Sequence, residues 1–304
     1  SFALAVTGMA DLLGELRPDC LVVEGDRYEI LATTIGAVHL GIPIFHLGGG
    51  DTSCGGLDEG FRHAISKLAH VHLVSNEAAA GRLIRMGEDP KQVHVVGEPA
   101  LDTIRKEAMI SRDILFRKYG LRPDDSLVVA VQHPRTTGME KAAEEMQETL
   151  AALKRVAVPT MILYPNGDAG GKRMIRVIKE EATEPFFQVL PSLSHLEFLS
   201  LLKECSVLAG NSSAGLLEAP SFGTPVVNIG PRQVGRPAAA NVIHCAHEAG
   251  AIEAALRRAL DPAFRKGLGT LVNPYGDGRS TEKIMPLLKG HPLGQGLLQK
   301  KNSY

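Results

Sequence analysis

Two carboxylate–arginine pairs in the first third of the chain could carry out proton-transfer chemistry. Asp26 and Arg27 follow the apolar run 21–23, and Asp58 stands four residues before Arg62 on a predicted helix. A positioned carboxylate can take a proton from carbon, and a guanidinium can stabilise the anion that forms. Two simpler interpretations remain open: Asp26 could cap a helix, and Asp58 could form an ordinary ion pair with Arg62 one helical turn away.

A glycine-rich segment, His46-Leu47-Gly48-Gly49-Gly50-Asp51, lies between these two pairs. Because glycine has no side chain, the backbone here could approach a ligand closely. A flexible surface loop is the alternative interpretation.

Polar residues in the second half of the chain suit a phosphate and a ribose. Residues 210–213, Gly-Asn-Ser-Ser, lead from an apolar run into a predicted helix whose first amide groups could bind phosphate. Glu218 follows on that helix and could accept hydrogen bonds from two ribose hydroxyls. The alternatives are a serine N-cap and an exposed helix glutamate. His133, Asn166 and Arg232 each follow another apolar run, where parallel sheets bind their ligands.

Short β-branched runs alternate with longer amphipathic segments along the whole chain, which predicts βαβ units and parallel sheets. The expected fold class is α/β with two doubly wound Rossmann-like domains, residues 1–110 and 111–285, followed by a tail, 286–304. About five or six strands are usual in such a domain, so the four in the first one predict that roughly two βα units are missing at its N-terminus. We expect strands at 21–23, 42–45, 71–74, 93–96, 127–131, 160–164, 187–190, 207–209 and 225–229, and helices that include 2–17, 77–86, 141–155 and 195–204.

Composition excludes several classes of function. The 304 residues include 33 basic and 34 acidic ones, a net charge of −1, so neither nucleic acid nor an anionic membrane is an expected partner. No apolar run approaches the ~18–20 residues of a membrane span, and the start has no signal-peptide pattern. The four cysteines lie far apart without a Cys-x-x-Cys pair, which argues against zinc and disulfides and fits the cytoplasm. Nicotinamide and ATP fingerprints are absent from the sequence.

The ordered series of motifs resembles the hydrolysing UDP-N-acetylglucosamine 2-epimerases of sialic-acid biosynthesis. The similarity runs from Ser1 to about Ser280. Each motif is weak alone, but their order is specific. The motifs are Gly-Asp-Arg-Tyr-Glu at 25–29, His-Leu-Gly-Gly-Gly-Asp at 46–51, Asp-Glu-Gly-Phe-Arg-His-Ala-Ile-Ser-Lys at 58–67, Gln-His-Pro at 132–134, Pro-Asn-Gly-Asp at 165–168, Gly-Asn-Ser-Ser-Ala-Gly-Leu-Leu-Glu-Ala-Pro at 210–220 and Arg-Gln-Val-Gly-Arg at 232–236.

The resemblance implies a GT-B architecture with a nucleotide sugar in the cleft between the two domains. UDP would lie mainly on domain 111–285, with its uracil near the backbone of Leu193. Arg27 and His133 would face the diphosphate or the sugar, and His46 would join the substrate-binding set. The remaining UDP-binding residues would be Asn166, Ser212, Ser213, Glu218 and Arg232.

The implied reaction is elimination of UDP across C1–C2 to give a 2-acetamidoglucal, followed by hydration with inverted configuration at C2. Asp26 or Asp58 would take the C2 proton and the other would act in hydration, with Arg62 and His133 also in the catalytic set. The resemblance implies neither a cofactor nor a metal. It also implies that the protein assembles as a homodimer or homotetramer. The charge on the departing UDP would be stabilised by Arg27, His133, Ser212, Ser213 and Arg232.

Two departures from the family pattern widen the choice of function. Many members carry a glutamate at the position of Gly48, which Asp51 could partly replace, and the missing front would have held a Gly-Thr-Arg loop. The alternatives are therefore the same chemistry on a UDP- or GDP-N,N'-diacetylbacillosamine-type sugar on the way to legionaminic acid, a GT-B glycosyltransferase, or a non-catalytic nucleotide-sugar-binding fragment. Without the front, we expect weak UDP binding and no turnover.

Overall fold

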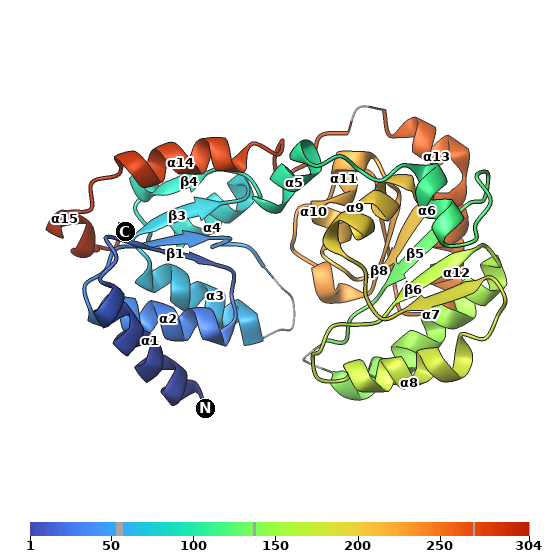
Figure 1. Cartoon of the computed structure of the whole chain (residues 1–304), viewed down its shortest axis with the longest axis horizontal. Helices are drawn as coiled ribbons and strands as arrows, with labels where there is room; N and C mark the ends of the chain where they lie inside the picture. Colours follow the sequence, from blue (N-terminus) through green and yellow to red (C-terminus); the bar gives the residue numbers. More distant parts are fainter. Residues whose placement is uncertain (53–56, 136–137, 270, 304) are drawn as a thin grey trace. The chain divides into compact units, whose positions relative to one another are not determined.

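A computed structural model describes residues 1–52, 57–135, 138–269 and 271–303. The chain forms two compact units, one of Ser1–Asp102 together with Tyr275–Tyr304, and one of Thr103–Pro274 (Figure 1). Each unit has one sheet, and all strand pairs are parallel. None of the helices in the described ranges has the length and apolar character needed to span a membrane.

The first unit is built on a four-stranded sheet in the order β1-β2-β3-β4. Alternate residues of β2 face opposite sides, because side chains of a strand alternate between its faces. Ile44 packs with α1, α2 and α3, whereas Phe45 packs on the other face. The elements are β1 (Leu21–Glu24), β2 (Ile44–Leu47), β3 (Val71–Val74), β4 (Val93–Val95), α1 (Phe2–Leu16), α2 (Tyr28–His39), α3 (Leu57–Leu68), α4 (Glu77–Arg85), η1 (Pro90–Gln92), α5 (Ala100–Lys106), α14 (Ser280–Gly290) and α15 (Gln295–Leu298).

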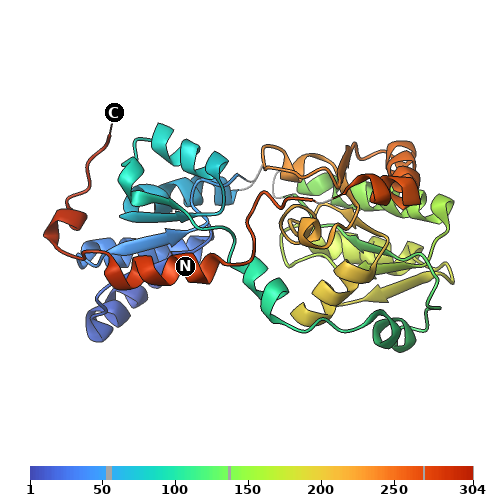
Figure 2. The same cartoon turned by 90° about the horizontal axis from the view of Figure 1, so that it is seen from above.

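Helix α14, which follows the second unit in the chain, returns to the first sheet, as both views show (Figure 1, Figure 2). Ile284 packs with Phe45 and Leu73 on the face opposite α1–α3. Asp102 caps the helix by accepting hydrogen bonds from the backbone amides of Ser280 and Thr281, both at 2.8 Å.

The boundaries of the two units differ from the predicted domain boundaries. Residues 275–285 belong to the first unit instead of the second domain, and residues 286–304 pack on the first unit instead of forming a separate tail. The N-terminal stretch of the first unit also ends at Asp102, not at residue 110. The physical reason is that the apolar face of α14 buries itself on the first sheet.

The second unit has a six-stranded sheet in the order β10-β9-β8-β5-β6-β7. Strand order reverses between β5 and β8, which creates the crevice where open parallel sheets bind ligands. The elements are β5 (Val128–Val131), β6 (Thr160–Leu163), β7 (Phe187–Leu190), β8 (Val207–Gly210), β9 (Val226–Ile229), β10 (Val242–Cys245), α6 (Arg112–Lys118), η2 (Met139–Lys141), α7 (Ala142–Val156), α8 (Gly171–Glu181), α9 (His195–Glu204), α10 (Ala214–Leu217), α11 (Ala219–Phe222), η3 (Pro231–Gln233), α12 (Ala249–Leu260) and α13 (Pro262–Gly267).

Apolar clusters cover both faces of the second sheet. Val128 and Ala130 of β5 pack with α7, α8 and α12, while Val129 and Val131 pack with α6 and α9. The doubly wound arrangement predicted for this half is therefore confirmed. The structure also contains β10, which the sequence analysis missed because this edge strand is only partly buried and includes the exposed His244.

Candidate functional site

The first unit carries a buried arginine at the carboxyl ends of β1 and β2. The side chain of Arg62 on α3 is 2% exposed, and its guanidinium forms an ion pair with Asp26, which is 26% exposed. Its Nη1 also donates to the backbone oxygen of Asp51 at 3.1 Å and contacts Glu59 Oε2 at 3.2 Å. A fixed arginine thus holds a partly accessible carboxylate directly after β1.

The helix-cap alternative for Asp26 is wrong. The N-cap of α2 is Arg27, and Asp26 points instead to the Arg62 guanidinium. The Arg27 side chain is 61% exposed and lies 3.4 Å from Glu29. Asp58 stands in the first turn of α3, is partly buried and interacts with its surroundings. The structure therefore brings Asp26 and Arg62 together and leaves Arg27 on the surface of this unit.

His46 is a structural residue in this unit, in contrast to its predicted place in the substrate-binding set. It is fully buried, its Nε2 donates to the carbonyl of Gly25 at 2.9 Å, and its Nδ1 lies 3.1 Å from the Ser66 hydroxyl. Burial lowers the pKa of His46 to about 4, so the imidazole is neutral at physiological pH. Since both ring nitrogens are engaged, His46 fixes the turn before Asp26.

The three glycines form an anchored turn and not a flexible surface loop. Gly48 and Gly50 have φ of +76° and +72°, which other residues rarely adopt. A Cβ at Gly49 would come within 2.9 Å of His46 Nδ1, and Arg82 donates to the Gly50 carbonyl. The backbone therefore has a defined path after β2.

In the second unit, His133 and Asn211 flank the point where strand order reverses. His133 follows β5 and Asn211 follows β8. The Asn211 side chain accepts from the His133 amide at 2.7 Å and donates to the His133 carbonyl at 2.9 Å. Gly210, the last residue of β8, has φ +126°, and a Cβ there would meet the carbonyl oxygen of Val131 at 2.0 Å. The two loops are therefore fastened to each other.

His133 is held as a neutral hydrogen-bond donor. Its Nδ1 accepts from the backbone amide of Asn166 at 3.1 Å, which leaves the proton on Nε2. Burial, with a further contribution from the Arg232 charge, lowers the pKa of His133 to about 4. The imidazole could thus donate to a ligand without carrying a positive charge. The Asn166 side chain in turn donates to Asp168 at 2.6 Å.

The segment after β8 is not the continuous helix that the sequence predicts. It is split into the four-residue helices α10 and α11, with Pro220 near the start of α11. Ser213 precedes α10 without a side-chain capping bond to the described residues, and Ser212 Oγ accepts from the Ala214 amide at 3.4 Å. The predicted phosphate site at a helix N-terminus is therefore reduced to one short turn.

Glu218, at the junction of these two helices, is not an exposed helix glutamate. Its Oε2 is buried and has no hydrogen-bond partner within the described part of the chain. Burial raises the pKa of Glu218 to about 7. A buried carboxylate oxygen without a partner is costly, so the site is suited to a ligand that donates hydrogen bonds.

Arg232 and Leu193 complete the predicted set. Arg232 Nη1 donates to the backbone oxygen of Asn211 at 3.0 Å, so Arg232 lies beside the His133 loop. Gln233, which the sequence analysis missed, donates to the same oxygen at 2.8 Å. Leu193 follows β7 and packs against the apolar cluster on one face of the sheet.

The sequence analysis also did not single out Asn211, whose side chain holds the His133 loop. Its position between a strand-ending glycine and Ser212 was the available signal. Within the described residues, no group of three or more histidine, cysteine, aspartate or glutamate side chains is arranged to hold a metal ion.

Two parallel-sheet domains with polar clusters at the carboxyl ends of their strands define an α/β protein of GT-B architecture. The sequence profile of the UDP-N-acetylglucosamine 2-epimerase family matches residues 1–289. The chain belongs to this family of epimerase enzymes.

Two curated relatives and one solved structure illustrate the similarity. The UDP-N,N'-diacetylbacillosamine 2-epimerase (hydrolyzing) of Legionella pneumophila is 38% identical over 98% of this chain and 78% of its own length. The UDP-N-acetylglucosamine 2-epimerase of Neisseria meningitidis is 34% identical over 84% of this chain and 67% of its own. The crystal structure of a Neisseria meningitidis UDP-GlcNAc 2-epimerase bound to UDP-GlcNAc has a TM-score of 0.82 and 20% identity, and covers 95% of this chain and 81% of that one. This last likeness concerns the fold.

Proposed function

We propose that the chain is a hydrolysing 2-epimerase that converts a UDP-linked 2-acetamido sugar and water into UDP and the free 2-epimeric sugar. The observation that carries this proposal is the unpartnered, buried carboxylate oxygen of Glu218 in the second unit. A ribose diol supplies two donors for such a carboxylate, and the neighbouring loops offer donors for a diphosphate. The Legionella relative is named a hydrolyzing 2-epimerase, which supports the hydrolysing form of the reaction.

The UDP half of the substrate would be bound by the second unit. Glu218 would accept from the ribose, and Arg232 would neutralise phosphate charge. His133 would donate through its Nε2–H, which costs no ionisation because the imidazole is already neutral. Asn166, Ser212 and Ser213 would supply further hydrogen bonds, and Leu193 would lie near the uracil. Donors fixed in advance stabilise the charge that grows on a leaving group.

The first unit would carry out the proton chemistry. Asp26 or Asp58 takes the proton from C2, the electrons of the C2–H bond form the C1=C2 double bond, and the C1–O bond breaks to release UDP. Water then adds to the glucal: hydroxide bonds to C1 and a proton returns to C2 from the opposite face. During these steps the ion pair with Arg62 would hold Asp26 in place. The exposed Arg27 would be available to the diphosphate.

The proposed substrate is a UDP-linked diacetamido sugar in preference to UDP-N-acetylglucosamine. The Legionella relative is named for such a sugar and matches 98% of the chain. In addition, Gly48 stands where many family members have a glutamate, and its φ of +76° disfavours any larger residue. A hypothetical Cβ at Gly48 has open space around it, its nearest neighbour being the Gly25 amide nitrogen at 3.9 Å. Removing an acidic side chain leaves room for an acetamido group.

The test is incubation of the protein in D₂O with each candidate sugar nucleotide, analysed by ¹H and ³¹P NMR. From the family match we expect free UDP and a 2-epimeric sugar with deuterium at C2, formed faster from UDP-N,N'-diacetylbacillosamine than from UDP-N-acetylglucosamine. Such turnover would overturn the expectation of weak UDP binding without turnover that was drawn from the four strands of the first domain. A sugar that stays bound to UDP would contradict the hydrolysing reaction. Protium retained at C2 would contradict elimination. Faster turnover of UDP-N-acetylglucosamine would instead favour the second substrate.

Three further expectations, the first from the cysteine pattern and the other two from the resemblance, remain predictions. They are a cytoplasmic location, a homodimer or homotetramer, and a product that supplies the synthesis of sialic or legionaminic acid.

A further inference from the structure

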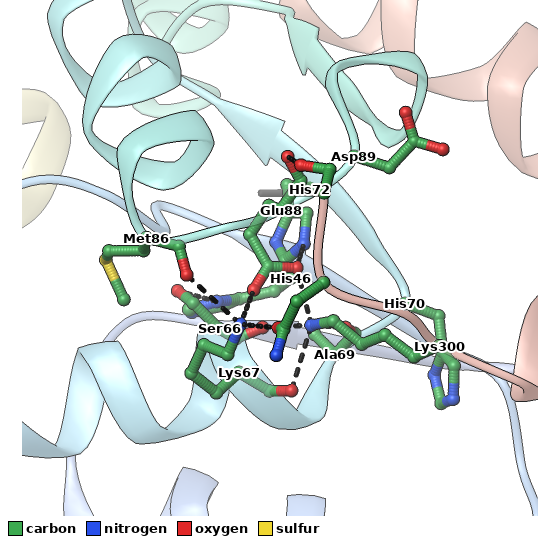
Figure 3. A network of polar contacts seen from close by, with 12 residues as sticks. His46, Ser66, Lys67, Ala69, His70, His72, Met86, Glu88, Asp89 and Lys300 are labelled. Carbon is green, nitrogen blue, oxygen red and sulfur yellow. Dashed lines mark hydrogen bonds and ion pairs between the residues drawn. The ribbon is translucent and has the colours of Figure 1, made fainter.

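A buried glutamate lies at the centre of a charged network in the first unit. Glu88, which follows α4, is 1% exposed, and its carboxylate contacts Lys67 and His72 at 2.8 Å and Lys300 at 2.5 Å (Figure 3). Burial alone would raise the pKa of Glu88, but these three donors together hold it at about 2. The carboxylate is therefore ionised at neutral pH and depends on its cationic partners.

Lys300 also caps the end of α3. Its ammonium lies 3.0, 2.9 and 2.7 Å from the backbone oxygens of Ser66, Lys67 and Ala69. The last carbonyls of a helix have no partner within the helix and form the negative end of its dipole, so a cation is stabilising there. A single ammonium from the far end of the chain thus joins the end of α3 to Glu88.

The residues after Lys300 hold it in place. The Ser303 amide donates to the Gly87 carbonyl at 3.0 Å, and the Ser303 hydroxyl donates to the Glu88 carbonyl at 2.9 Å. Asn302 Oδ1 accepts from Lys67 at 2.9 Å. The segment 300–303 is consequently part of the packed first unit.

Helix α3 leads from this network to the proposed proton chemistry. Ser66, whose carbonyl contacts Lys300, bonds through its hydroxyl to His46, and His46 donates to the Gly25 carbonyl just before Asp26. Arg62, one turn earlier on the same helix, forms the ion pair with Asp26. The position of α3 therefore sets the placement of Asp26 through two separate contacts.

We infer that Lys300 is a positioning residue for the proton-transfer site: it fixes the C-terminal end of α3 and thereby the location of Arg62, His46 and Asp26. None of the motifs that indicate the family includes Lys300. The inference rests on the proposed function in one respect, namely that Asp26 or Asp58 acts on C2.

The test compares K300M with K301M, which removes the neighbouring exposed lysine. We expect kcat of K300M to fall by about 10- to 100-fold, because small displacements of reacting groups have effects of this size. Binding of UDP, which the proposal assigns to the second unit, should change by less than about twofold. Hydrogen–deuterium exchange at residues 25–27 and along α3 should become faster in K300M and stay unchanged in K301M.

A second variant separates positioning from mere stability. In K300M the buried Glu88 carboxylate keeps Lys67 but loses the ion pair to its Oε2. E88Q/K300M removes that carboxylate charge as well, so thermal stability should recover relative to K300M, whereas kcat should stay low because Lys300 no longer caps α3. This variant also carries the comparison if K300M alone does not fold. Wild-type-like kcat in K300M, or kcat that recovers together with stability, would overturn the inference.

Failure of the proposed function would look different. In that case the wild-type protein would release no UDP from either sugar nucleotide. The exchange measurement would still decide the structural claim, since it needs no substrate. Wild-type-like exchange at residues 25–27 in K300M would overturn it.

Discussion

Replacing Glu218 with glutamine should stabilise the second unit and, at the same time, weaken its binding of UDP. Burial raises the pKa of Glu218 from 4.5 to about 7. The folded protein therefore holds this proton more tightly than the unfolded chain does, and the free energy of unfolding falls as the pH rises from 4.5 through 7. Each unit of difference between the folded-state and unfolded-state pKa is worth about 1.4 kcal/mol. The free energy of unfolding above pH 7 is therefore lower by at most about 3 kcal/mol.

Glutamine does not titrate, so the advantage of E218Q should be small at pH 5 and largest at pH 8. Thermal unfolding of both proteins at these two pH values measures it, with a shift of roughly 2–4 °C per kcal/mol for a domain of this size. E180Q is the matched control, because Glu180 lies exposed on α8. The melting temperature of E180Q should differ from that of the wild-type protein by the same amount at both pH values.

UDP binding should change in the opposite direction. Loss of hydrogen bonds to a charged acceptor costs about 1.5–3 kcal/mol, so calorimetry at pH 8 should show a Kd that is roughly 10- to 100-fold higher in E218Q. Lowering the pH from 8 to 6 should weaken binding more in the wild-type protein than in E218Q, because only wild-type Glu218 becomes protonated. An E218Q variant that binds UDP like the wild-type protein would refute the assignment of Glu218 to the ribose. A stability difference that does not grow with pH would refute the argument from burial.

Three further predictions concern the first unit. D58N should lower kcat by about 10²-fold or more with nearly unchanged UDP affinity, as expected for a general acid or base; unchanged kcat would return Asp58 to a structural role. R62M should destabilise the protein by about 3 kcal/mol in denaturant unfolding, because it leaves Asp26 without its buried partner, whereas R27M at the exposed pair should cost less than about 1 kcal/mol. G48E should lower stability by about 1–2 kcal/mol, since φ is +76° there; a melting temperature equal to that of the wild-type protein would show that the turn relaxes.

The sequence by itself determined the strands and the loops that carry the chemistry. Runs such as Val128–Val131 identify buried parallel strands because apolar β-branched residues are a local property of the chain. Because parallel strands end at one edge of their sheet, assigning the strands also identifies the loops that lie together at that edge. The order of the motifs was enough to indicate the family, which the match over residues 1–289 confirms.

Only the tertiary structure decided which of these side chains meet. Arg62 joins Asp26 from 36 residues away, and His46, which looks like a ligand-binding imidazole in sequence, has both ring nitrogens engaged inside the first unit. Glu218 lies where its predicted helix breaks into two short turns, and its Oε2 is buried by the packing of the second unit, which the local sequence does not show. Lys300 reaches α3 across 231–234 residues of sequence. Such contacts depend on how segments that are distant in sequence pack against each other. The local pattern of residues does not determine which distant side chains become neighbours in the folded protein.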